Sequence, residues 1–103
     1  MFEAFKQLGH HRRADKVTKA LAMACSAIEA SQIHVADRQL EAAYKLCLET
    51  TFVRTPHIEL ITWWGLIGMT LEEMGHPELA DHCTKMSALL QARFDAGQYF
   101  RES

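Results

Sequence analysis

Apolar side chains recur at intervals of three and four residues along most of the chain, which is the period of a helix. The clearest set is Leu60, Trp64, Ile67, Leu71 and Met74. Three more sets share this spacing, namely Val17, Leu21, Ala24 and Ile28, then Leu40, Ala43, Cys47 and Thr51, and finally Leu79, Cys83, Met86 and Leu90. No segment sustains the two-residue alternation that strands show. Each set predicts one buried helix face, so the chain is predicted to be all-α.

Helix ends in the C-terminal half are marked by Pro and Gly. Thr55 is expected to cap a helix, with Pro56 at its first position. Gly75 suits the left-handed conformation that closes a helix, and Pro77 is expected to start the next one. These residues predict an antiparallel helix pair, His57–Met74 and Pro77–Phe94, ended by Gly97.

The N-terminal half has fewer such marks. Gly9 is expected to separate a short helix, Phe2–Leu8, from a longer helix that begins near His11. Because no Gly or Pro occurs between Ala14 and Phe52, the next break is placed near Gln32–Asp37, with Asp37 as its cap. The spacing predicts a single domain of residues 1–103 with about five helices joined by short turns.

Several residue pairs recur 66 positions further along the chain. This displacement is close to two periods of about 34 residues. Gly9-His10, Ala14-Asp15 and Thr18-Lys19 recur as Gly75-His76, Ala80-Asp81 and Thr84-Lys85. Residues 61–90 resemble one repeat of the tetratricopeptide (TPR) family, in a degenerate form. The positions that carry the resemblance are Trp64, Ile67-Gly68, Leu71, Gly75, Ala80 and Ser87. A plain helical bundle is the alternative to this interpretation.

The resemblance implies antiparallel helix pairs stacked as a short TPR-like α-solenoid, in which the first helix of each pair lines a groove. Mapped onto this sequence, the groove positions are Thr62, Gly65, Met69 and Glu72. Trp63 either packs on the preceding helix or serves as an interface anchor, a role in which Trp is enriched. The family members that clamp a C-terminal carboxylate use Lys and Asn at such positions, and this chain has no Asn, so that mode is not expected.

A protein–protein interaction module follows from the resemblance. We expect an adaptor or chaperone-like protein that binds a helical or extended segment of a partner, similar in size to small bacterial adaptors and secretion chaperones. The alternative is a homodimeric structural or regulatory module that touches nucleic acid through a basic patch. That patch contains Arg12, Arg13, Lys16 and Lys19. A net charge of −2 makes nucleic acid an unlikely general partner.

Catalytic, metal and cofactor sites are not expected. His76 and His82 lie six residues apart, which does not match metal-ligand spacing on a helix. The thiols of Cys25, Cys47 and Cys83 fall on predicted buried faces, where they are inert. Three dispersed free cysteines fit a reducing cytoplasm. The first residues do not predict a signal peptide, and no apolar run reaches the ~18–20 residues that a membrane span needs.

Overall fold

A computed structural model describes residues 2–101 of the chain, with side chains described for residues 9–101. This part contains four helices, and they are α1 (Phe2–Glu29), α2 (Ile33–Glu49), α3 (Arg54–Glu73) and α4 (Pro77–Asp95). The predicted all-α class is confirmed. The molecule is elongated, with principal extents of 47 × 22 × 17 Å.

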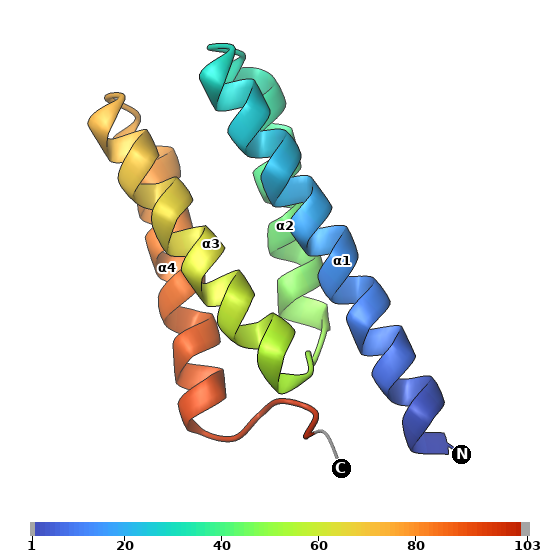
Figure 1. Ribbon diagram of the computed structural model, residues 1–103. Helices are drawn as coiled ribbons and strands as arrows, with labels where there is room; N and C mark the ends of the chain where they lie inside the picture. Colours follow the sequence, from blue (N-terminus) through green and yellow to red (C-terminus); the bar gives the residue numbers. More distant parts are fainter. Residues whose placement is uncertain (1, 102–103) are drawn as a thin grey trace.

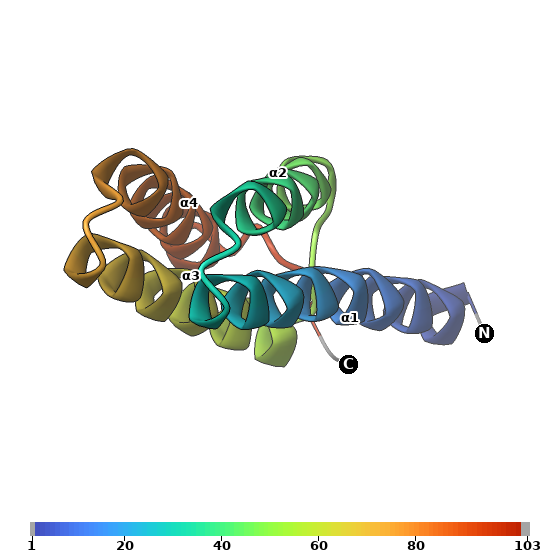
Figure 2. The ribbon, with the colours of Figure 1, turned by 90° about the horizontal axis from the view of Figure 1, so that it is seen from above.

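The helices form two antiparallel hairpins that lie side by side. The most extensive packing is between α3 and α4 and between α1 and α2, while α1 also contacts α3. Helices α2 and α4 touch each other least. Figure 2 shows α1 and α3 in one layer and α2 and α4 in the other. Both hairpin turns lie at the same end of the molecule (Figure 1).

Helix α1 runs without interruption through Gly9, so the predicted break there is wrong and the count is four helices rather than about five. A glycine inside a helix costs only about 1 kcal/mol relative to alanine. Gly75 differs because Pro77 follows it, and proline restricts the preceding residue and cannot continue a helix. The residue pairs at a displacement of 66 therefore differ in structure at this point, since Gly9-His10 lies inside a helix and Gly75-His76 lies in a turn. His10 and His11 do not lie in a turn.

The N-cap of α3 lies two residues before the predicted cap, Thr55. The N-cap is Val53, so Thr55 and Pro56 lie inside the first turn, where proline is tolerated because that N–H has no helical partner. Val53 forms a bridge with Phe100 near the C-terminus, and the Phe100 N–H donates to the carbonyl of Phe52 at 2.8 Å. A contact from the far end of the chain thus fixes this boundary.

The two hairpin turns close in the same way. Gly75 takes a φ of 84° as predicted, and the N–H of the next residue donates to the carbonyl of Leu71 at 2.9 Å. In the first turn Ser31 takes a φ of 59°, and the next N–H donates to the carbonyl of Ala27 at 2.7 Å. Helix α2 starts directly afterwards, so Asp37 lies within it and is not its cap. Gly97, with a φ of 71°, ends α4 as predicted.

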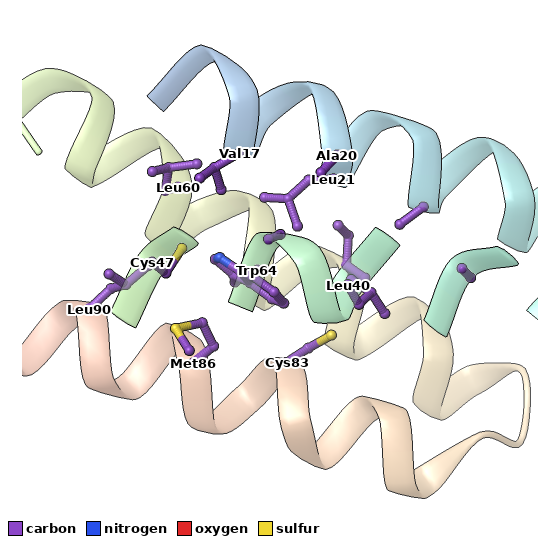
Figure 3. Packing of buried hydrophobic residues seen from close by; sticks show 14 of the residues in the cluster. Val17, Ala20, Leu21, Leu40, Cys47, Leu60, Trp64, Cys83, Met86 and Leu90 are labelled. Carbon is purple, nitrogen blue, oxygen red and sulfur yellow. The ribbon is translucent and has the colours of Figure 1, made fainter. Parts of the chain in front are cut away.

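The predicted apolar faces meet in one core. Figure 3 shows Trp64 of α3 between the side chains of α1, α2 and α4. All the predicted seam residues are buried except Thr51, Met74 and Leu79, of which Thr51 and Met74 lie just beyond the ends of α2 and α3 and Leu79 is partly buried. Gly68 lets α3 approach α4 closely, since a Cβ there would lie 3.2 Å from the Cβ of Cys83 and 3.3 Å from the carbonyl oxygen of Ala80.

Candidate functional site

The exposed side of α3 is unusual because it is apolar. We define the outer face of α3 as Ile58, Thr62, Leu66, Met69 and Thr70. Leu66 is 58% exposed, Met69 62% and Ile58 43%, although the opposite side of the same helix carries the buried core. From Leu60 to Leu71 the helix has no ionisable side chain. A helix that is apolar on nearly every side is normally covered on every side.

A shallow groove between α1 and α3 adjoins this face. It has a volume of about 230 Å³, and Trp63, Leu66 and Thr70 of α3 line it together with Cys25 and Ile28 of α1, among others. Trp63 is partly buried and packs against the core cluster, as the packing interpretation predicts. Its role as an interface anchor stays a prediction.

The predicted groove positions do not all share one surface. Thr62, Met69 and Glu72 are exposed on α3. Gly65 instead lies toward α4, because a Cβ there would stand 3.6 Å from the Ser87 hydroxyl oxygen. Ser87 in turn donates to the carbonyl of Ile61 at 3.0 Å. Gly65 therefore serves the contact between α3 and α4.

The predicted basic patch lies on α1. Arg12, Arg13, Lys16 and Lys19 are all exposed. In the part of the chain with described side chains, the ion pairs are Lys45–Glu41 on α2 and Lys85–Asp81 on α4, so none of the four residues takes part in one. None of the four residues lines the groove between α1 and α3, and their role in binding a partner stays a prediction.

A larger groove, which the sequence did not reveal, lies between α2 and α4. Its volume is about 540 Å³, and Trp64 lines it between Leu40 and Tyr44 of α2 and Leu79 of α4. Acidic, basic and polar side chains border it, namely Asp37, Glu41, Lys45 and His82. The periodicity assigns Leu40 and Trp64 to the core, but it carries no signal that α2 and α4 stand apart.

The far end of the two hairpins is tied together by polar contacts. The Arg93 guanidinium donates to the carbonyls of Cys47 at 2.9 Å and Leu48 at 3.4 Å, which satisfies carbonyl groups at the end of α2 from α4. This arginine was not recognised in the sequence, because its partners are backbone atoms 45 and 46 residues away.

An aromatic cluster surrounds His57 at the same end. Its ring contacts the rings of Phe52, Phe94 and Tyr99, with centroids 5.8–6.0 Å apart. Nε2 donates to the carbonyl of Leu90 at 2.9 Å, while the buried Nδ1 has no hydrogen-bond partner among the described residues. Burial lowers the pKa of His57 below its usual 6.5.

The thiols lie in surroundings that suppress their reactivity. Burial raises the pKa of Cys47 to about 11, against smaller opposing effects of Trp64 and Arg93. Burial also raises the pKa of Cys83 to about 12, and that of Cys25 is raised as well. All three are free thiols. A thiol with a raised pKa holds little thiolate at neutral pH and is a poor nucleophile.

The described side chains form no metal-binding cluster. In residues 9–101 there is no group of three or more His, Cys, Asp or Glu side chains placed to hold a metal ion. Within the same stretch, no helix has both the length and the apolar character that crossing a membrane requires.

These features define a small all-helical module of two stacked hairpins with an uncharged, solvent-facing helix surface. A scan against models of protein families, a search of curated proteins and a search of solved structures each return no match to the chain.

Proposed function

We propose that this protein is an interaction module, an adaptor or chaperone-like protein, that binds a helical or extended segment of another protein through the outer face of α3. The single observation that carries the proposal is the exposure of Leu66 and Met69 on a helix without ionisable side chains from Leu60 to Leu71. Contiguous exposed apolar patches on soluble proteins mark binding surfaces.

The energetics favour covering this face. Fully burying a Leu or Met side chain stabilises by about 1.5–3 kcal/mol, and Leu66 and Met69 still expose more than half of theirs. Trp63 adds a rigid aromatic ring beside them, of the type that dominates binding energy at interfaces. A partner segment laid along three turns of α3 would contact all three residues, which is the helix-in-groove mode of recognition.

We further propose that the two hairpins are degenerate TPR-like repeats related by 44 residues, a displacement longer than the period of about 34 residues that the 66-residue identities suggested. Equivalent positions in the two hairpins carry small residues, and the matching pairs are Ala24 and Gly68, Ala36 and Ala80, and Ala43 and Ser87. The left-handed turn residues Ser31 and Gly75 have the same separation. In the TPR family the first helices line the binding surface, and α1 and α3 lie in one layer here.

Site-specific photo-crosslinking in native cells tests the proposal. A photoreactive residue in place of Leu66 is expected to yield one predominant adduct with another protein, and the additional change Met69→Glu should abolish it. The matched control is Met23→Glu, the same change at a methionine that is 50% exposed on α1, and it should leave the adduct intact. An adduct only with a second copy of this chain, or no adduct at all, would refute the proposal.

A further inference from the structure

The outer face of α3 is bordered by carboxylates that have no cationic partner. Glu59 lies near its start, and Glu72 and Glu73 lie in the last turn of the helix. All three are exposed. Neither ion pair among the described side chains involves them, since those pairs join Lys45 to Glu41 and Lys85 to Asp81 in the other layer.

A fourth carboxylate belongs to the same border. Glu29 is the last residue of α1 and lines the groove between α1 and α3, beside Thr70. Neither α1 nor α3 has a basic residue in its last turn. The only cationic side chain of α3 is Arg54, at its opposite end.

Three of these carboxylates lie at the end of the molecule that holds both turns. The helix dipoles do not add to their charge, because the N-terminal ends of α2 and α4, with the opposite partial charge, lie at the same end. Glu29, Glu72 and Glu73 all stand at helix C-terminal ends, and the ends of α1 and α3 lie on the same side of the molecule (Figure 1). This concentration of negative charge, next to an apolar face, is suited to attract a cationic partner.

We infer that the partner segment is an amphipathic helix that carries Lys or Arg at both ends of its apolar stripe. This inference rests on the proposed function. The apolar stripe of the partner helix covers Leu66, Met69 and the exposed part of Trp63. Its basic residues meet Glu59 at one end, and Glu72 and Glu73 at the other. The uncharged stretch between them, Leu60–Leu71, spans about 18 Å, so the two basic groups of the partner stand three to four helical turns apart.

Two synthetic peptides serve as probes of this charge selection. Both peptides form a helix of about 20 residues with the same Leu stripe. One peptide carries Lys at both ends of that stripe, and the other carries Glu at the same positions. Binding of each labelled peptide to the full chain is measured by fluorescence anisotropy. The Lys peptide is expected to bind at least about tenfold more tightly at about 50 mM salt, with the difference shrinking as salt screens the charges.

Charge-removing variants locate the effect. Glu59→Gln/Glu72→Gln/Glu73→Gln should reduce the preference for the Lys peptide to about threefold or less. The control Glu41→Gln/Glu49→Gln/Glu78→Gln removes the same charge from α2 and α4 and should keep the preference. Both sets change exposed side chains, so neither is expected to unfold the chain.

The outcomes separate this inference from the proposed function. Equal affinity for the two peptides, no binding of either, or an equal loss of preference in the control variant would overturn the charge selection. If Met69→Glu abolishes binding of both peptides while their affinities are equal, the docking face stands and only its charge preference fails. If Met69→Glu leaves peptide binding unchanged, the proposed docking face is itself wrong.

Discussion

The first helices of the two hairpins differ in what they show to solvent. On α1 the exposed side carries Arg12, Arg13, Asp15, Lys16 and Lys19, and its one large exposed apolar side chain among the described residues is Met23. On α3 the exposed side carries Leu66 and Met69 between carboxylates at its two ends. Both helices occupy the same layer and both bury one side in the common core.

The same backbone plan therefore carries two different surfaces. Packing needs only one side of each helix, so the outer side is free to vary without loss of the fold. On α1 the outer side carries mainly charged side chains, whereas on α3 it carries an apolar surface. This contrast is why we propose α3 as the docking helix.

The largest expected effect concerns the crossing of α3 and α4, which is the closest contact of the second hairpin. Gly68→Leu should destabilise the protein by about 3 kcal/mol through overpacking, because even a Cβ would lie 3.2 Å from Cys83 and 3.3 Å from the Ala80 carbonyl. Thermal or urea unfolding measures the change. Gly65→Ala is the control, since its Cβ would meet only Ser87, at 3.6 Å, and it should stabilise the protein by up to about 1 kcal/mol because alanine favours a helix over glycine. Equal stability of the two variants would contradict the assigned crossing.

The second largest expected effect on stability concerns the hydrogen bonds from Arg93 that join the two hairpins. Arg93→Met keeps much of the aliphatic packing but removes the donors to the carbonyls of Cys47 and Leu48. The expected loss is about 2 kcal/mol, typical of hydrogen bonds from a charged group. Urea unfolding checks this, with Gln91→Ala as an exposed control on the same helix. An unchanged unfolding midpoint for Arg93→Met would show that the hairpins hold together without this contact.

His57 makes stability depend on pH. Its pKa is lowered in the folded protein by burial, aided by the nearby Arg93 and opposed by the hydrogen bond to Leu90. Below pH 6.5 the unfolded chain takes up a proton that the folded protein resists, so stability should fall as the pH drops from 7 toward 5. The slope from one such proton is at most about 1.4 kcal/mol per pH unit.

Melting temperatures across that pH range test this expectation. His57→Gln should flatten the dependence, although it also lowers stability by removing a packed ring. His34→Gln, at an exposed position of α2, should leave the slope as it is. The same slope in the wild type and in His57→Gln would exclude His57 as its source.

The smallest expected effects on stability come from substitutions in the two hairpin turns. Ser31 holds a φ of 59°, a conformation that favours glycine, at the position equivalent to Gly75 with its φ of 84°. Ser31→Gly should stabilise by about 0.5 kcal/mol, and Gly75→Ser should destabilise by about 1 kcal/mol. Chemical unfolding resolves the pair. Effects of the same sign would mean that the two turns are not equivalent.

Local patterns account for most of what the sequence predicted correctly. The apolar period placed Leu60, Trp64, Ile67 and Leu71 on one buried face, and the Gly75 and Pro77 pair fixed the second turn. Gly9 misled the prediction because a glycine is tolerated inside a helix at a cost of only about 1 kcal/mol, so its presence alone does not mark a helix end. Of the identities at a displacement of 66 residues, Gly9-His10 and Gly75-His76 have different local structures, whereas the other two pairs lie within helices α1 and α4.

Features that depend on distant contacts were beyond the reach of those patterns. The start of α3 is set by the bridge between Val53 and Phe100, and the end of α2 by Arg93. The separation of α2 and α4, which opens the larger groove, follows from how the hairpins pack as whole bodies. Gly65 was predicted to line the binding groove, but it lies toward α4. The sequence could not predict this, because the helical period does not tell which neighbouring helix a residue contacts.

The methionine methyl groups offer the most direct test of the docking face. Met69 lies on the outer face of α3, Met23 on α1 and Met86 in the core, with exposures of 62%, 50% and 1%. Carbon-13 methyl spectra of the full chain would be recorded while the Lys-flanked peptide is added. The account predicts a large shift or broadening of the Met69 signal, with Met23 and Met86 nearly unchanged. A larger response at Met23 than at Met69, or equal responses at both, would contradict it.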